Sequence, residues 1–294
     1  MDRHYLLPGA IIATRESMKI STILGSCVAV ALFDRSKNIC GLCHYLLSHF
    51  EDSPGSIARY GDQAIPMLID EMVALGANPA ALVAQVYGGA NMLGSVSIGI
   101  GISKKNIAVA HELLDSLKIR ILKEDTGGTR GRKLLLSTDT FEIKQSFMEK
   151  TAQPKPGFAK ISLRALIIDP TPRTNKGFEN IITQSGITVT RTASDSFDAF
   201  STIKSDPPDI IILRLYNQSK SELQIFKDLK KMTVLPPVYV FSIGGTGIPA
   251  TEALAIGASD FVHGNSSLDL EALKCLAAFL AEKIWANNLI RKHG

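Results

Sequence analysis

The chain has 294 residues, 45% of them hydrophobic and 20% charged, which is typical of a globular protein with room for two ordinary domains. Its formal net charge of +4 is too small over this length to indicate nucleic acid or an anionic membrane surface as a partner. Since no apolar run reaches the ~18 residues of a membrane span and the N-terminus lacks a signal-peptide core, we expect a cytoplasmic protein without membrane insertion.

The first predicted elements are two apolar strands joined by a polar hairpin. Residues from Thr22 to Phe33 are mostly apolar, small or β-branched, and Gly25-Ser26 interrupts them, so they predict two short strand pieces around a turn. Residues 34–38 are polar turn material, and Ile39 to Leu47 predict the next strand. A connection this short favours antiparallel pairing of the strands on either side of it.

Cys27 and His44 lie on these neighbouring strands, where they form a candidate catalytic pair. A cysteine thiolate beside a histidine that takes up its proton supports acyl transfer on amides or esters. Backbone N–H groups around Gly25, Ser26 and Cys27 could stabilise the tetrahedral oxyanion. The pair meets only if the strand register puts both side chains on one face. The other interpretation is that both residues simply pack inside an apolar strand.

The segment from Cys40 to His44 also matches Cys-x-x-Cys-His, a motif typical of covalent haem attachment. Haem attachment requires export, and the sequence shows no export signal. Zinc is disfavoured because no second ligand pair completes a tetrahedral set, and a redox dithiol would need a different strand–helix context. The chain has only 4 cysteines, which fits a reducing compartment. We therefore expect no cofactor and no metal, with Cys40 and Cys43 as packing residues.

Strands and helices alternate through the rest of the N-terminal half. Leu82 to Tyr87 predict a strand that ends at Gly88-Gly89. Asn106 is a candidate N-cap for the helix that follows. Further on, a glycine-rich turn that contains Gly127-Gly128 separates two short apolar strands. Strands first and interleaved helices afterwards indicate an α+β fold or a layered α/β sandwich.

A stretch rich in proline and lysine at 149–160 divides the chain. It predicts one domain over 1–150, a linker over 151–160 and a second domain over 161–294.

The second domain alternates strands and helices in a regular way, and a long helical pattern runs from about Leu268 to Ile290. Five such units favour a doubly wound parallel sheet of five strands. The predicted strands are Leu163–Ile168, Thr188–Thr190, Ile210–Leu215, Val238–Phe241 and Asp260–Val262.

Ordered sequence blocks over roughly residues 6–145 resemble the chemoreceptor glutamine deamidase family, CheD. The blocks are Leu24 to Val30, Cys43 to Leu47, Arg59 to Asp62, Gly88 to Met92, Ile98-Gly99 with Asn106, and Glu124 to Gly128 with Arg132. By this resemblance Cys27 is the nucleophile, His44 the general base, and the fold an α/β sandwich. The family's third catalytic position is a threonine six residues before the cysteine. That position is Ser21 here, with Thr22 next to it as a substitute.

The resemblance also implies a role for the glycine turns. Those at Gly88-Gly89 and Gly127-Gly128, together with Gly25 and Ser26, are expected to bind substrate at the rim of the site. The alternative is that they are tight turns with no further role.

The implied reaction converts receptor glutamine to glutamate in chemotactic adaptation. A thioester on Cys27 forms as ammonia leaves, and water then hydrolyses it. The implied partners are chemoreceptor cytoplasmic domains and a CheC-type phosphatase. An alternative is a non-catalytic protein that keeps this fold to bind the phosphatase or a receptor.

The second domain resembles a response-regulator receiver that has lost its phosphorylation chemistry. Asp169 matches the acidic end of the first strand, but Pro170 replaces the second acidic residue, and Arg214 stands at the position of the phosphorylated aspartate. Ser242 keeps the hydroxyl position, whereas Gly264 replaces the expected lysine. Because a cation repels Mg²⁺ and cannot accept a phosphoryl group, we expect a pseudo-receiver that serves docking or dimerisation, or in which Arg214 mimics part of a fixed signalling state.

Overall fold

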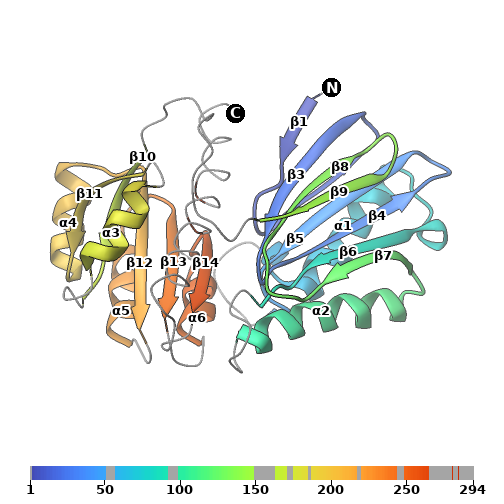
Figure 1. The fold of residues 1–294 in the computed structure, drawn as a ribbon. Coiled ribbons are helices and arrows are strands. Elements are labelled where there is room, and N and C mark those ends of the chain that lie inside the picture. The colour runs from blue at the N-terminus through green and yellow to red at the C-terminus, as the bar shows by residue number, and fades with distance from the viewer. Residues whose placement is uncertain are drawn as a thin grey trace. The chain divides into compact units, whose positions relative to one another are not determined.

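The structure is a computed structural model, and it describes residues 2–50, 57–91, 99–148, 163–170, 175–184, 187–216, 220–243 and 248–264, with Leu280 and Ile284. The chain divides into two compact units, whose described residues lie before 149 and after 162 (Figure 1). The predicted linker at 151–160 lies outside the described residues, as does the helix predicted from Leu268 to Ile290 apart from Leu280 and Ile284.

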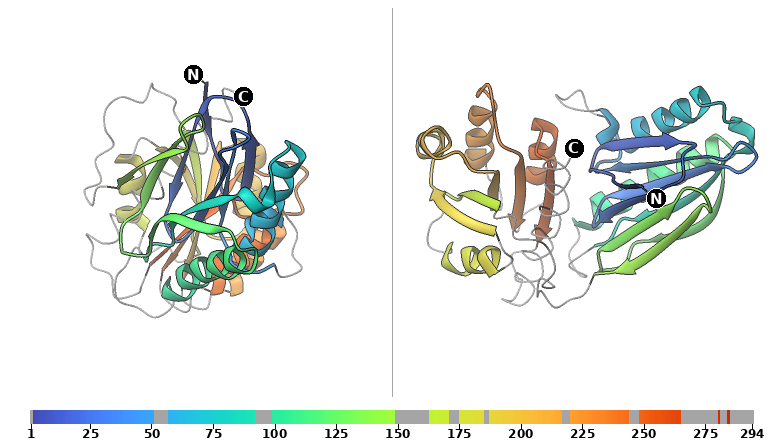
Figure 2. Two further views of the ribbon diagram at one scale, coloured as in Figure 1. Left: turned by 90° about the vertical axis from the view of Figure 1, so that its right-hand side faces the viewer. Right: turned by 90° about the horizontal axis from the view of Figure 1, so that it is seen from above.

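The first unit is a three-layer α/β sandwich, as predicted. A five-stranded sheet in the order β2-β5-β4-β6-β7 carries both helices on one face (Figures 1 and 2). A four-stranded sheet in the order β1-β3-β8-β9 covers the other face. The elements are β1 (Asp2–Tyr5), β2 (Ala10–Thr14), β3 (Met18–Leu24), β4 (Val28–Asp34), β5 (Ile39–Tyr45), α1 (Gly61–Ala74), β6 (Val83–Gly88), α2 (Gly99–Ser116), β7 (Arg120–Thr126), β8 (Arg132–Ser137) and β9 (Glu142–Phe147), with single 3₁₀ turns at Ile57–Arg59 and Pro79–Ala81.

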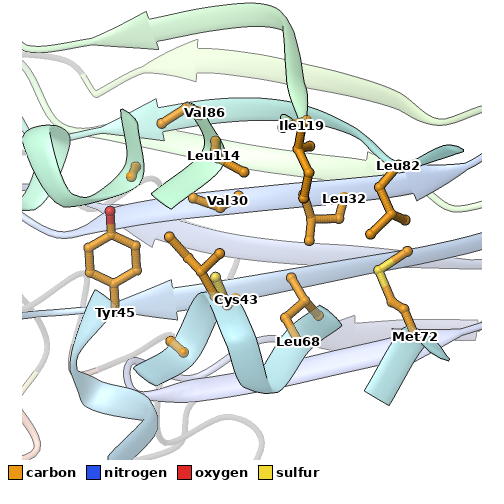
Figure 3. Close-up of a cluster of buried hydrophobic side chains, with 14 of the residues drawn as sticks. Val30, Leu32, Cys43, Tyr45, Leu68, Met72, Leu82, Val86, Leu114 and Ile119 are labelled. Atoms are coloured by element: carbon orange, nitrogen blue, oxygen red, sulfur yellow. The ribbon is translucent and has the colours of Figure 1, made fainter. Parts of the chain in front are cut away.

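Strands β4 and β5 are buried along their whole length because both faces of their sheet are covered. Side chains alternate between the faces of a strand. One set, which includes Val30, Cys43 and Tyr45, packs against α1 and α2 in the cluster of Figure 3. The other set faces the second sheet, where the rings of Phe33 and Phe141 meet at 5.1 Å between centroids. The central strands are therefore apolar on both faces, as a middle layer requires.

Asn106 does not cap a helix, so the predicted N-cap is wrong. Helix α2 already begins at Gly99, and Asn106 lies in its interior, fully buried. The two glycines near the start of α2 have low helix propensity and concealed its first turns in the sequence. Burial leaves the polar Asn106 side chain to find partners inside the sandwich.

The second unit is a five-stranded parallel sheet in the order β11-β10-β12-β13-β14, with helices between successive strands (Figure 1). This order confirms the predicted doubly wound sheet, and all of the predicted strands are present. The elements are β10 (Leu163–Ile168), α3 (Asn175–Gln184), β11 (Ile187–Ala193), α4 (Ser196–Ser205), β12 (Ile210–Tyr216), α5 (Lys220–Leu229), β13 (Val238–Ile243), α6 (Ile248–Ile256) and β14 (Asp260–Gly264).

None of the helices that the structure describes, in either unit, combines the length and the apolar character needed to cross a membrane.

Candidate active site

The β4–β5 register predicts that Cys27, one residue before β4 begins, lies on the same face of the five-stranded sheet as His44. In the β4–β5 ladder, Ala29 pairs with His44 and Val28 with Tyr45. Extending this register by one residue puts Cys27 opposite Leu46, diagonal to His44. Diagonal neighbours on one face lie about 7–8 Å apart at Cα, within reach of a long side chain. The face they share looks toward the four-stranded sheet.

A threonine from that opposing sheet holds the His44 ring. The Thr22 hydroxyl oxygen lies 2.8 Å from His44 Nδ1, and the same hydroxyl donates its proton to the Leu6 carbonyl at 2.9 Å. Because a hydroxyl has only one proton to donate, its contact with His44 is as an acceptor from Nδ1–H. In the neutral imidazole this leaves the lone pair on Nε2, the nitrogen that a general base would use.

Ser21 lies on the other face of the same strand. Its hydroxyl contacts the His4 carbonyl oxygen at 3.4 Å, whereas Thr22 next to it reaches the ring of His44. Adjacent residues of a strand point in opposite directions, so only one of the two hydroxyls can face the ring. The geometry favours Thr22 as the residue that orients His44.

The turn at Gly88-Gly89 lies directly against the Cys27 segment. Gly89 N–H donates to the Cys27 carbonyl at 2.7 Å, and Ala90 N–H donates to the Gly25 carbonyl at 2.7 Å. A Cβ atom on Gly88 would lie 2.3 Å from the Cys27 carbonyl oxygen, and its φ of 110° is one that L side chains rarely adopt. Only glycine therefore allows this turn to approach the candidate nucleophile so closely.

The turn at Gly127-Gly128 joins the same cluster. Gly127 N–H donates to the Gly88 carbonyl at 2.9 Å, and Asn91 N–H donates to the Gly128 carbonyl at 2.7 Å. The structure thus brings together the three turns that the sequence singled out. We call the turns at 25–27, 88–91 and 127–128 the three-turn cluster.

Asn106 is a residue of this region whose contacts the sequence did not reveal. Its side-chain nitrogen donates to the Ser26 carbonyl at 3.1 Å and to the Leu46 carbonyl at 2.8 Å. In the sequence, Asn106 stood out as a candidate N-cap and as part of one family-like block, and neither signal indicates these contacts.

The candidate pair is closed to solvent in this structure. Cys27 and His44 both have 0% relative exposure, as do Leu24 and Leu46 nearby. A substrate would reach the sulfur only if the surrounding segments separated. Hydrogen bonds of the three-turn cluster join the segments next to Cys27.

In the second unit, Arg214 stands at the position of the phosphorylated aspartate of receivers, and it forms an ion pair. Arg214 on β12 donates from Nη1 to Asp169 Oδ2, and both side chains are buried. The guanidinium also lies over the rings of Phe178 and Tyr216, at 4.5 and 5.0 Å from their centroids. Mg²⁺ requires accessible oxygen ligands, and the Asp169 carboxylate already binds a cation. These residues do not fit a receiver-type metal.

Comparison with known proteins identifies both units. The family described as "CheD chemotactic sensory transduction" matches residues 47–146, and "Response regulator receiver domain" matches 165–270. A protein of Sulfurimonas denitrificans named "Probable chemoreceptor glutamine deamidase CheD" is 38% identical over 141 residues, which cover 48% of this chain and 90% of that relative. The chain belongs to the CheD family. A second relative, "Probable chemoreceptor glutamine deamidase CheD 1" of Anaeromyxobacter dehalogenans, is 41% identical over 135 residues, or 46% of this chain and 78% of its own.

The receiver domain that follows the CheD unit is recognised by its family match and its strand order. Among solved structures, the receiver domain of NtrX from Brucella abortus is 24% identical, with a TM-score of 0.33, and covers 40% of this chain and 98% of that one. The match to the CheD family model begins at residue 47, beyond Cys27 and His44.

In this CheD chain the Cys40–His44 motif is not arranged as a ligand set. Cys43 packs toward the helices, and Cys40, three residues earlier on the same strand, points to the opposite face. Burial raises the pKa of both thiols to about 12, so neither ionises near neutral pH. Within the described part of the chain, no group of three or more His, Cys, Asp or Glu side chains could hold a metal ion.

Proposed function

We propose that this CheD chain is a chemoreceptor glutamine deamidase whose nucleophile is Cys27. The observation that carries the proposal is the hydrogen-bond chain from the Leu6 carbonyl through Thr22 to His44 Nδ1, on the face that Cys27 shares. It keeps the Nε2 lone pair available to take a proton. The names of the two relatives supply the substrate class, a glutamine side chain of a chemotaxis receptor.

The proposed reaction proceeds in two steps through a thioester. His44 Nε2 takes the thiol proton of Cys27, and the thiolate attacks the side-chain carbonyl carbon of the glutamine. The C–N bond breaks as His44 returns the proton, and ammonia leaves. Water, deprotonated by His44, then attacks the thioester carbon, and the C–S bond breaks to give glutamate and the free thiol. Backbone N–H groups around Gly25, Ser26 and Cys27 stabilise the oxyanion in both steps.

We further propose that Thr22, rather than Ser21, is the third catalytic position, and that the three-turn cluster binds the substrate. Turnover requires the three turns to separate enough for a glutamine side chain to reach the buried sulfur. The hydrogen bonds that hold the cluster closed are few and each is modest in net strength, about 1 kcal/mol. A receptor segment that replaces them with its own backbone bonds would offset their loss.

The receiver domain, in this proposal, is a binding unit that is not phosphorylated. We place the domain boundaries at 1–150 and 161–294, with the linker over 151–160 between them. Arg214 occupies the position of the phosphate acceptor, so the unit lacks both a nucleophile and a metal ligand there. A CheC-type phosphatase is the partner that the family resemblance suggests. Labelling of the full chain by acetyl phosphate at a receiver residue would overturn this part of the proposal.

A second candidate function is a binding protein that keeps the CheD fold without turnover. The full burial of Cys27 and His44 favours this alternative, because a sealed thiol does not turn over. Its partners would be a receptor or a CheC-type phosphatase.

The deciding experiment measures ammonia release from a chemoreceptor cytoplasmic fragment by the full chain. We expect release from the wild type and a loss of about 10³-fold or more in Cys27→Ala. Cys40→Ala is the matched control, since Cys40 is a buried thiol on the neighbouring strand and is expected to retain activity. Mass spectrometry of the fragment identifies the glutamine that is converted. Equal release by wild type and Cys27→Ala contradicts the assignment, and tight receptor binding by an inactive wild type supports the binding protein.

A further inference from the structure

The hydrogen-bond ladder of the catalytic strands ends just before the candidate nucleophile. The last paired residues of β4 and β5 are Val28 and Tyr45. Cys27 lies one residue beyond that pair, where the ladder no longer fixes the distance between the two segments. Its carbonyl is tied to the Gly88-Gly89 turn, but this bond does not link it to the strand that carries His44. A contact that spans both segments would help to set the spacing between them.

The Asn106 side chain provides that contact. Its Nδ2 donates to the carbonyl of Ser26, the residue before Cys27, and to the carbonyl of Leu46, which lies opposite Cys27 in the extended register. Both hydrogens of the amide are therefore used, one for each segment. The orientation of the amide follows from the same contacts, because its oxygen would repel two carbonyl acceptors.

Helix α2 anchors this amide rigidly. Asn106 is fully buried, and the hydroxyl of Tyr45 donates to the Asn106 backbone carbonyl at 2.5 Å. Tyr45 is the last residue of β5 and the neighbour of His44. The backbone carbonyl of Asn106 thus accepts a hydrogen bond from Tyr45, and its side chain donates one to Leu46, the residue after Tyr45. The backbone of Asn106 is therefore tied to the end of β5.

We propose that Asn106 is a positioning residue, which bridges the carbonyls of Ser26 and Leu46 and thereby holds Cys27 at the distance from His44 that proton transfer requires. The inference rests on the proposed function of Cys27 and His44 as nucleophile and base. Asn106 itself touches neither side chain in any described hydrogen bond, and it acts through the backbone of the two segments.

The test compares Asn106→Ala with Leu114→Ala in the full chain. Leu114 is a fully buried residue of the same helix that packs in the apolar cluster of Figure 3, so its truncation destabilises the unit without removing the bridge. We expect Asn106→Ala to lower kcat for ammonia release by about 10²-fold with a KM within about threefold, as displacement of a reacting group does. Leu114→Ala is expected to keep kcat within about threefold while its thermal unfolding midpoint falls.

A second readout needs no substrate. The rate of Cys27 alkylation by iodoacetamide is followed against pH, with peptide mass spectrometry to separate Cys27 from the other thiols. In this proposal, loss of the His44 contact moves the midpoint of the profile to higher pH, whereas easier access to the buried thiol raises only the plateau rate. We expect the midpoint to shift in Asn106→Ala and to stay in place in Leu114→Ala.

The outcomes separate this inference from the proposed function. If the wild type releases no ammonia, the proposed function fails, and the alkylation midpoint still decides whether Asn106 positions Cys27. If Asn106→Ala and Leu114→Ala behave alike in kcat and in midpoint, the positioning role is overturned. If Asn106→Ala does not fold, the same measurements on Asn106→Ser decide the matter, since its shorter side chain cannot span both carbonyls.

Discussion

Both units have a buried strand at or next to their family's reactive position, but the residues found there differ in kind. In the CheD unit, Cys27 directly precedes β4, and Thr22 contacts the ring of His44 on the neighbouring strand β5. In the receiver domain, Arg214 occupies the reactive position and binds Asp169. Both folds are intact, so the comparison separates the fold of a unit from the chemistry that it can perform.

The two sites also differ in the kind of contact between their polar side chains. Thr22 and His44 meet through a hydrogen bond between a hydroxyl and an imidazole ring. Arg214 and Asp169 form a buried guanidinium–carboxylate pair, and separating these charges would leave each of them desolvated. The CheD unit thus has a hydrogen bond where the receiver domain has a buried ion pair.

The largest effect is expected from removing the base in the CheD unit. Replacing His44 by Gln keeps a polar side chain of similar size but leaves no group to take the Cys27 proton. We expect kcat/KM for ammonia release to fall by about 10²- to 10⁴-fold, the usual contribution of a general base. His49→Gln is the control, because His49 is an exposed histidine of the same unit. Activity of His44→Gln within about threefold of the wild type would contradict the role of His44 as the general base.

In the receiver domain, breaking the ion pair should cost stability rather than activity. Arg214→Ala leaves the Asp169 carboxylate buried without its cation, which typically costs about 3–5 kcal/mol of unfolding free energy. Urea unfolding of the full chain, followed by hydrogen exchange in β10 and β12, reports on this unit. Arg164→Ala removes an exposed pair with Asp206 and is expected to have a much smaller effect. Equal effects of the two substitutions would show that the buried pair contributes no more to stability than the exposed one.

Much of the fold could be predicted from the sequence because local patterns dictate it. The apolar runs around Gly25-Ser26 and the polar stretch at 34–38 predicted strands β4 and β5. The predicted ends of these two strands differ from the observed ends by only a few residues. In the receiver domain, the alternation of apolar strands and helical patterns was enough to predict the parallel sheet. These features depend on near neighbours in the chain.

The site was less predictable because it depends on register and on contacts between layers. Counting residues back from Cys27 pointed to Ser21, but the direction of each side chain on β3 follows from pairing, and Thr22 is the residue that faces His44. Likewise, nothing local shows that Asn106 bridges two segments far from it in sequence. A one-residue change of register would have placed every one of these groups differently.

A smaller effect is expected from removing the hydroxyl of Thr22 on β3. Thr22→Val keeps the shape of the side chain but removes the acceptor that fixes the His44 tautomer. A neutral hydrogen bond is worth about 0.5–1.5 kcal/mol, so we expect kcat to fall by up to about tenfold. Ser21→Ala on the other face of the strand is the matched control and should leave kcat unchanged. The reverse result, with Ser21→Ala impaired and Thr22→Val normal, would contradict the assignment to Thr22.

The smallest effect concerns two buried carboxylates, one in each unit. Asp169 is paired with a cation, whereas Asp34 accepts hydrogen bonds from Ser36 and from the backbone N–H groups of Ser36, Lys37 and Asn78. Burial acts to raise the pKa of Asp34, but these hydrogen bonds outweigh it, led by that of the Ser36 hydroxyl, and the pKa falls below its ordinary value of 3.8.

The contribution of Asp34 to stability is therefore present above about pH 4 and is lost as the pH falls through its lowered folded-state pKa. Asp34→Asn should cost roughly 1 kcal/mol of unfolding free energy at neutral pH, and this difference from the wild type should shrink in acid. Denaturant titrations of the CheD unit over this pH range measure it. Asp139→Asn, at an exposed turn, is the control and should follow the wild type throughout. A pH-independent difference between Asp34→Asn and wild type would mean that the charge of the carboxylate is not what the turn recognises.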